Sequence, residues 1–164
     1  MLEGGIVDVD SRRLECTDVQ LWSQLTLLSN QISQLLDRKL TRRHGLGLTD
    51  FMALSALAAK PDRSIRMQEL ADEIGVNQST LSRVATRLEQ AGLVARRTSE
   101  ADRRGIHIAL TDSGRTSFDE SMATFQDELA VAFEMASLSP RTAALVALLR
   151  PLDGQPAADG PTQG

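Results

Sequence analysis

The side chains best suited to specific chemistry lie between residues 66 and 104, and they are hydrogen-bonding and cationic groups. Amide, hydroxyl and guanidinium groups make the hydrogen bonds with which proteins contact base edges and phosphates. The pattern therefore indicates a DNA-binding surface. The residues that we expect to contact DNA are Arg66, Asn77, Gln78, Ser79, Thr80, Ser82, Arg83, Thr86, Arg87, Asp102, Arg103 and Arg104.

Two short helices joined by a tight turn would position most of these side chains. The first, over residues 67–74, has an apolar stripe of Leu70, Ala71 and Ile74. The second buries Leu81, Val84, Ala85 and Leu88. Gly75 lies at the turn, where glycine takes a positive φ without steric cost, and Asn77 can cap the second helix. Any helical hairpin uses such residues, so this segment alone predicts a helix pair and no function.

Two alternating segments follow the second helix directly, after Gly92. In the first, Val94, Arg96 and Thr98 alternate with Ala95 and Arg97. In the second, Ile106, Ile108 and Leu110 alternate with His107 and Ala109. Period-two segments joined by a polar, glycine-containing loop predict a β-hairpin. A helix-turn-helix followed at once by a hairpin is much rarer by chance than either part. The order therefore predicts a mainly α protein with a small β-hairpin wing, a winged helix-turn-helix.

The wing also carries a specific motif. Asp102, Arg104, Leu110 and Thr111 fit the pattern D-x-R-x(5)-L-T, and over roughly residues 18–150 the chain resembles the MarR (multiple antibiotic resistance regulator) family of bacterial transcriptional regulators. The segments LEQAGLV at 88–94 and GLTDFMALSAL at 47–57 are similar to family segments as well. Taken without the family, residues 101–104 could equally form a solvated charged turn.

The resemblance implies a homodimer whose long N- and C-terminal helices build the interface. It also implies that Arg104, held by Asp102, lies at the wing tip and enters the minor groove of double-stranded DNA, where a narrow groove attracts arginine. A small effector, of aromatic or phenolic type, is a further partner that the resemblance suggests.

Composition and charge agree with a helical DNA-binding chain. The 164 residues are about one domain's worth of material, and 41% are hydrophobic but only 3% aromatic. The net charge of −4 is unevenly distributed: residues 78–115 hold seven Arg against four acidic residues, whereas residues 116–164 hold two Arg against seven. We found no apolar run of about 18 residues and no signal-peptide pattern, which predicts a cytoplasmic protein without a membrane partner.

The flanking segments predict helices that begin at recognisable caps. One helix would run from Asp18 to about Arg43, and Thr49 would cap the next. Thr111 would cap a long helix after the wing, and Ser139 with Pro140 would start a final helix that ends near Arg150. Apolar stripes that exceed what a monomer easily buries are assigned to a dimer interface: Leu21, Leu25, Leu28, Ile32, Leu145, Leu148 and Leu149.

These elements predict a division of the chain into regions. Residues 47–110 form the winged helix-turn-helix, and residues 17–46 and 111–150 form the helical dimerisation region. Residues 1–16 and 151–164 lack apolar periodicity, which predicts a disordered arm and tail.

Catalytic and metal-binding functions lack support. His44 and His107 fall in different predicted elements without a cysteine nearby, and no G-x-S-x-G, Walker A or G-x-G-x-x-G motif occurs. We therefore expect no enzyme activity, no catalytic residue, no metal and no cofactor. The single cysteine, Cys16, allows a redox-sensing alternative, since one branch of the family senses hydroperoxides with such a thiol. In that branch tyrosines hydrogen-bond the thiolate, and this chain has no Tyr.

Two hypotheses from different classes remain. The first is a sequence-specific transcriptional regulator, a homodimeric repressor that binds a pseudo-palindromic operator and is released by a small ligand. The second is a winged-helix protein-interaction module whose basic face docks an acidic partner. Gln78, Ser79, Ser82 and Arg83 favour the first, because a protein-docking face usually presents an aromatic or aliphatic anchor.

Overall fold

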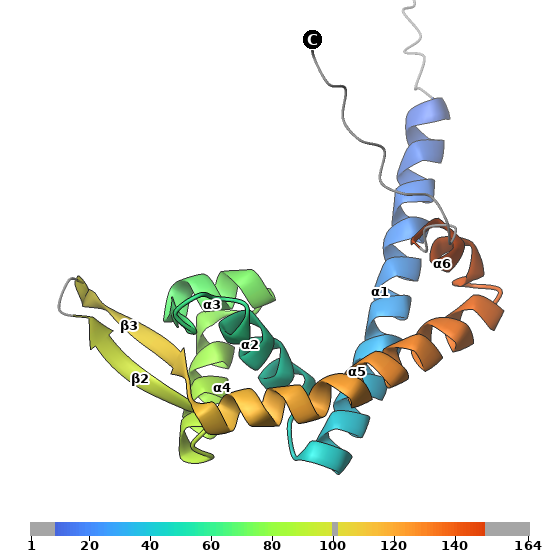
Figure 1. The fold of residues 1–164 in the computed structure, drawn as a ribbon. Coiled ribbons are helices and arrows are strands. Elements are labelled where there is room, and N and C mark those ends of the chain that lie inside the picture. Colours follow the sequence, from blue (N-terminus) through green and yellow to red (C-terminus); the bar gives the residue numbers. More distant parts are fainter. Residues whose placement is uncertain (1–8, 100–101, 150–164) are drawn as a thin grey trace, which may run out of the picture. The chain divides into compact units, whose positions relative to one another are not determined.

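The computed structural model describes residues 9–99 and 102–149, with side chains over 17–97 and 106–149 (Figure 1). Its helices and strands, in chain order, are α1 (Val9–His44), α2 (Leu48–Ala58), β1 (Ser64–Arg66), α3 (Met67–Ile74), α4 (Gln78–Gln90), β2 (Val94–Ser99), β3 (Asp102–Leu110), α5 (Asp112–Leu138) and α6 (Ala143–Leu149). The predicted fold class, a mainly helical winged helix-turn-helix, is confirmed. The chain forms two compact units: a winged unit, residues 33–130, and a helical unit, residues 1–32 with 131–164.

The core of the winged unit lies between its helices and one face of its sheet. Leu54 and Leu57 of α2, Leu70 of α3 and Leu81 of α4 are at most 1% exposed. Phe51 stacks on Phe125 with ring centroids 4.4 Å apart. In a chain with few aromatic residues, these Leu and Phe side chains belong to the apolar core that contains α4 residues Leu81, Val84, Ala85 and Leu88.

The sheet of the winged unit has three antiparallel strands in the order β1-β3-β2. Ile65 of β1 pairs with Ile108 of β3, and Val94 of β2 pairs with Leu110, so that these residues share the inner, buried face. Figure 1 shows β2 and β3 as a hairpin that extends beyond α3 and α4. The sequence predicted the hairpin but missed β1, because a strand of three residues is too short to show a period.

The start of α2 differs from the prediction. Gly47, and not Thr49, is the N-cap residue. The free backbone N–H groups of the first turn are satisfied by acidic side chains: Gly47 N donates to Asp50 Oδ2 at 2.9 Å, and Leu48 N donates to Asp37 Oδ1 at 2.8 Å. Because these two carboxylates accept the exposed donors, the helix can begin two residues earlier than a threonine cap would allow.

The junction between the hairpin and α5 is tight. Thr111 caps α5 as predicted, since its Oγ1 accepts a hydrogen bond from Gly114 N at 3.0 Å. The same hydroxyl lies 2.8 Å from the carbonyl oxygen of Gly92, and Thr111 N donates to the carbonyl of Leu93 at 3.1 Å. A Cβ atom added to Gly114 would collide with the Leu93 carbonyl oxygen and approach Leu110 Cδ1 to 2.8 Å. Only glycine fits where α5 meets the hairpin.

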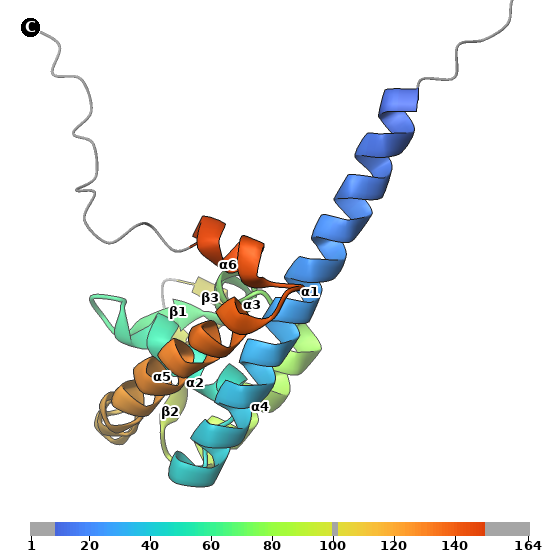
Figure 2. The same cartoon turned by 90° about the vertical axis from the view of Figure 1, so that its right-hand side faces the viewer.

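Two helix starts outside the winged unit also differ from the predictions. The helix α1 begins at Val9 instead of near Asp18, and Figure 2 shows it as one uninterrupted helix. No Gly or Pro occurs between Val9 and His44, so nothing in the sequence stops the helix from extending past the apolar stripe. The helix α6 begins at Ala143, after a turn in which Thr142 N donates to the carbonyl of Ser139 at 3.0 Å.

The helical unit has a small core and a largely apolar surface. Leu28, Ala136, Leu145 and Val146 are buried together, with Ile32 and Phe133 packed against them. The assignment of Leu28 and Leu145 to a dimer interface is therefore wrong, because their own unit covers them. The large apolar side chains that stay exposed in this unit are Val19, Leu21, Trp22, Leu25, Val131, Met135, Leu138, Leu148 and Leu149.

Candidate DNA-binding site

The turn between α3 and α4 is built by two residues. Gly75 ends α3 with φ 70° and ψ 34°, a left-handed conformation that glycine adopts without strain. Asn77 caps α4, and its Oδ1 accepts hydrogen bonds from Thr80 N at 2.8 Å and Ser79 Oγ at 2.7 Å. Both local predictions are confirmed. The cap uses the side-chain oxygen of Asn77, so within the candidate site this residue orients the start of α4.

One face of α4 is free to meet a ligand. Leu81, Val84 and Leu88 on the opposite face are at most 3% exposed, which fixes the rotation of the helix about its axis. Gln78, Ser79, Ser82 and Arg83 are consequently exposed together. Among the residues that the structure describes, Arg83 makes no ion pair and no side-chain hydrogen bond. Its guanidinium group is available for a bidentate contact with a guanine or for a phosphate contact.

Thr86 belongs to a hydrogen-bond network that joins α4 to the wing. Its Oγ1 donates to the Ser82 carbonyl at 2.9 Å and accepts from Arg96 Nη2 at 2.8 Å. The Nε of Arg96 lies 3.4 Å from Glu89 Oε2, so that β2 is tied to α4 by an ion pair as well. Arg96 was not among the predicted site residues. Its alternation in β2 was recognisable in the sequence, but its partners on α4 were not.

Arg87 is held by an acidic side chain from another helix. Its Nε donates to both carboxylate oxygens of Asp50, at 3.1 and 3.2 Å, and its Nη2 donates to Oδ1. The Asp50 side chain is only 3% exposed, whereas that of Arg87 is 57% exposed. The hydrogen bonds that Arg87 donates to Asp50 raise the pKa of the Arg87 guanidinium above its ordinary value. Arg87 therefore anchors α4 to the start of α2, and sequence reasoning missed Asp50 because the two residues are far apart in the chain.

The wing is described mainly by its backbone. The strands β2 and β3 are paired from Val94 with Leu110 to Ser99 with Asp102, with an irregularity between Thr98 and Ser99. The side chains of Asp102, Arg103 and Arg104, which are predicted to contact DNA, lie outside those that the structure describes, as does that of Cys16. At the other edge of the sheet, Arg66 is the N-cap residue of α3 and lies 4.0 Å from Glu69.

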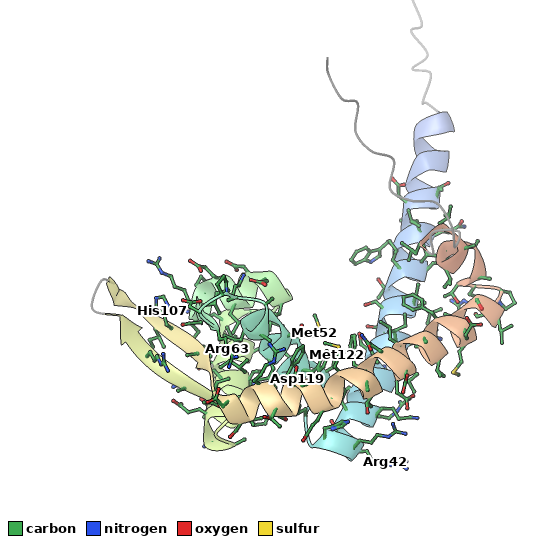
Figure 3. All side chains as sticks on the ribbon, viewed as in Figure 1. Arg42, Met52, Arg63, His107, Asp119 and Met122 are labelled. Atoms are coloured by element: carbon green, nitrogen blue, oxygen red, sulfur yellow. The ribbon has the colours of Figure 1, made fainter. Side chains whose placement is uncertain are left out.

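The outer face of the sheet carries Arg97 and His107, which the predicted site did not include, beside Arg66, which it did. Arg97 of β2 and Arg66 of β1 both pair with His107 of the central strand β3. Figure 3 labels His107 on this sheet. The Nε2 atom of His107 is buried and has no hydrogen-bond partner. Their shared register could have been found from the sequence only if β1 had been recognised.

The described part of the chain shows neither a metal-binding cluster nor a membrane-spanning helix. Over residues 9–99 and 102–149, no group of three or more His, Cys, Asp or Glu side chains could hold a metal ion. No helix in the same residues is long and apolar enough to cross a membrane.

A capped helix pair with an exposed polar second helix, followed by a β-wing, defines a winged helix-turn-helix protein. Comparison with known proteins agrees with this class. The model of the MarR family matches residues 44–105, which contain α2, the helix-turn-helix and most of the wing. Over these residues the chain is similar to the MarR family, as it is to the relatives and the solved structure described next.

Two relatives and one solved structure illustrate the similarity. The transcriptional repressor MprA of Escherichia coli (strain K12) is 37% identical over 84 residues, which are 50% of this chain and 48% of MprA. The HTH-type transcriptional repressor MdtR of Bacillus subtilis (strain 168) is 35% identical over 77 residues, 47% of this chain and 50% of MdtR. The chain thus spans about half the length of the curated relatives it matches.

The solved structure extends over more of the chain. It is Sco3205, a MarR family transcriptional regulator from Streptomyces coelicolor, in complex with DNA. The similarity has a TM-score of 0.68 at 28% identity and covers 82% of this chain and 83% of Sco3205.

Proposed function

We propose that this chain is a sequence-specific DNA-binding transcriptional regulator of the cytoplasm. Residues 47–110 would bind DNA, with α4 in the major groove and the wing tip in the adjacent minor groove. The observation that carries the proposal is the exposed face of α4, where Gln78, Ser79, Ser82 and Arg83 are all accessible. The similarity to Sco3205, a protein solved in complex with DNA, supports the same conclusion.

A homodimer is the second part of the proposal. Residues 17–46 and 111–150 would form the interface, and the exposed apolar side chains of the helical unit, such as Trp22 and Leu148, support it. Twofold symmetry would set two copies of α4 about one DNA turn apart, roughly 34–36 Å, which requires a pseudo-palindromic operator. Because MprA and MdtR are repressors, repression is the proposed sign of regulation.

Release from DNA by a small ligand, of aromatic or phenolic type, completes the proposal. A ligand that prefers the conformation unable to bind DNA would shift the equilibrium by its difference in affinity for the two states. Arg87 and Arg96 connect α4 to α2 and β2, so a movement of either element would reach α4, which supports this part of the proposal.

The decisive experiment is a band shift of the full chain on the DNA upstream of its own reading frame, at two salt concentrations. Arg83→Ala should weaken binding by about 1–3 kcal/mol and relax the preference at one base pair, because a bidentate base contact is lost. Arg42→Ala is the matched control: Arg42 lies near the end of α1 (Figure 3), is exposed, and its loss removes the same charge. If Arg83→Ala and Arg42→Ala bind alike, α4 is not the recognition helix.

A further inference from the structure

Arg96 joins the hairpin to α4 by contacts at three of its nitrogen atoms. Its backbone N donates to Glu89 Oε1 at 3.3 Å, its Nε lies 3.4 Å from Glu89 Oε2, and its Nη2 donates to Thr86 Oγ1 at 2.8 Å. Among residues 94–97 of β2, whose side chains the structure describes, no other residue makes a hydrogen bond or ion pair with α4. One carboxylate thus holds both the main chain and the side chain of Arg96.

The position of Arg96 in the sheet explains why its side chain reaches α4. Arg96 pairs with Ile108, which is 1% exposed, so both side chains point to the inner face of the sheet that packs against the helices. At the next inner position along the hairpin, Ile106 is already 48% exposed. Because β2 is an edge strand, it also presents backbone N–H groups that no further strand satisfies, and Glu89 accepts one of them. Arg96 therefore lies where the hairpin leaves the cover of the helices.

The hydroxyl group of Thr86 is engaged both as a donor and as an acceptor. It donates its one proton to the carbonyl of Ser82 at 2.9 Å, and its oxygen accepts from Arg96 Nη2. A hydroxyl group in this arrangement has no proton left to donate to a base edge or to a phosphate. Thr86 and Glu89 continue the exposed stripe of α4 that begins with Ser79 and Ser82. The hairpin occupies this end of the stripe.

The contacts of Arg96 are too exposed to act mainly as a source of stability. The side chains of Arg96 and Glu89 are 35% and 40% exposed, and ion pairs at such sites contribute little to the free energy of unfolding. Their geometry is nevertheless restrictive, because a planar guanidinium group held by two acceptors on one helix cannot turn independently of that helix. The contacts therefore determine the position of the hairpin relative to α4.

We propose that Arg96, held by Thr86 and Glu89, is a positioning residue that fixes the wing against α4, so that the two elements bind DNA as one rigid unit. This inference rests on the proposed DNA-binding function, in which α4 enters the major groove and the wing tip enters the adjacent minor groove. A second contact that is already held at the correct distance strengthens binding, because little conformational freedom is lost when DNA binds. Thr86 then has a positioning role in place of the predicted contact with DNA.

Anisotropy titrations with a labelled duplex of the DNA upstream of the chain's own reading frame test the role of Thr86. Thr86→Val keeps the shape and the charge but removes the hydroxyl group, and it should weaken binding about three- to tenfold without changing the base preference. Thr86→Ser keeps the hydroxyl group and should bind like the unaltered chain. A changed preference at one base pair in Thr86→Val, or binding as tight as that of the unaltered chain, would contradict the positioning role.

The contact of the wing tip shows whether Thr86 acts through the hairpin. Arg104→Ala should weaken binding about tenfold in the unaltered chain but only about twofold in Thr86→Val, because a loosely held wing contributes less. A role in stability alone would lower the melting temperature of Thr86→Val and leave the effect of Arg104→Ala unchanged. Arg42→Ala is the charge-matched control: Arg42 is an exposed residue of α1, and its loss should have the same effect in both backgrounds.

Glu89 allows a test in which charge and position predict opposite signs. Glu89→Ala removes a negative charge beside the proposed DNA-binding surface, so charge alone predicts tighter binding. The positioning role predicts binding weaker by about threefold or more, because Arg96 loses two of its three contacts. The matched control is Glu120→Ala on α5, which loses the same charge at an exposed position and should not weaken binding. Tighter binding by Glu89→Ala would mean that Glu89 withholds Arg96 from DNA, and would overturn the proposal.

The possible results separate the two proposals. If the unaltered chain does not bind DNA, the proposed function fails and the positioning role fails with it. If Arg83→Ala weakens binding but Thr86→Val does not, or if Arg104→Ala has the same effect in both backgrounds, the positioning role alone is wrong. If Arg104→Ala has no effect in the unaltered chain, the wing makes no contact that Arg96 could position, and the inference fails while the assignment of α4 stands.

Discussion

In the winged unit, Leu54, Leu57 and Leu81 are completely buried, whereas in the helical unit Trp22 and Leu148 are 70% and 83% exposed. Among the described large apolar residues that are exposed, only Met52 and Ile106 belong to the winged unit. The winged unit thus satisfies its apolar surface with its own chain. The helical unit has a small core and leaves large apolar side chains exposed, which the second copy of the proposed homodimer would cover.

The same two units differ in how they use polar groups. The winged unit joins its helices and strands with long-range pairs, such as Asp50 with Arg87 and Glu89 with Arg96. These pairs fix the position of α4 and leave its outer face unoccupied. The two units therefore differ: the winged unit is held together by its own pairs, whereas the helical unit leaves large apolar side chains exposed, as the proposed dimer would require. Substitutions in each unit test this difference.

The largest effect is expected from Leu81→Ala in the core of the winged unit. Removal of a fully buried leucine side chain leaves a cavity and should lower the free energy of unfolding by about 2–5 kcal/mol. Urea unfolding at two protein concentrations measures it, with Met52→Ala, at 40% exposure, as the control in the same unit. The loss should not depend on protein concentration. Similar losses for the two variants would show that the core is placed wrongly.

An intermediate effect is expected from Arg87→Ala. It leaves the buried Asp50 carboxylate without its cation and should cost about 1–3 kcal/mol of stability, less than for a fully buried pair because Arg87 is more than half exposed. The raised pKa of Arg87 means that its contribution is fully present below the ordinary guanidinium pKa and declines only as the pH rises through the folded-state value. The unaltered chain should therefore still have a higher free energy of unfolding than Arg87→Ala at neutral pH, where the guanidinium group is charged.

A double-mutant cycle separates this anchoring role from DNA contact. Combined with Asp50→Asn, Arg87→Ala should cost clearly less than the sum of the two single losses, because the pair acts as a unit. The cycle is measured by urea unfolding in the absence of DNA. If the two losses of unfolding free energy simply add, the ion pair contributes nothing to the placement of α4.

The smallest effect on the free energy is expected from Trp22→Ala in the helical unit. If Trp22 lies in the dimer interface, its removal should raise the dimer dissociation constant by about tenfold or more, which corresponds to about 1.4 kcal/mol. Sedimentation equilibrium measures it, with Met52→Ala as the exposed control. In contrast to Leu81→Ala, the loss of thermal stability should vary with protein concentration. An unaltered chain that is monomeric at micromolar concentration would refute the dimer.

The parts of the structure that were predictable are those determined by near neighbours in the sequence. The bounds of α3, the left-handed Gly75, the Asn77 cap and the Thr111 cap each depend on a few consecutive residues. In each case one side chain or one glycine satisfies a backbone requirement at a helix end. The predicted winged fold followed from the order of these local signals.

The parts that were missed depend on partners distant in the sequence. Asp50 caps α2 together with Asp37 and binds Arg87 on another helix, so a local rule favoured Thr49 instead. The row formed by Arg66, His107 and Arg97 exists only because β1 joins the hairpin. Burial of Leu28 and Leu145 within one chain likewise required the placement of α1, α5 and α6. Spacing shows which face of a helix is apolar, but not what covers it.

The close approach at Gly114 has a consequence for the evolution of such a chain. Any side chain there would strike the carbonyl of Leu93, so a population of random variants should retain glycine at this position as strictly as it retains any residue that touches DNA. Yet Gly114 has no side chain with which to recognise a base. Intolerance to substitution at Gly114 would thus report how closely α5 packs against the hairpin. A survey of allowed mutations that took every intolerant position for a DNA contact would wrongly assign part of the DNA-binding surface to α5, the helix that follows α4 and the hairpin.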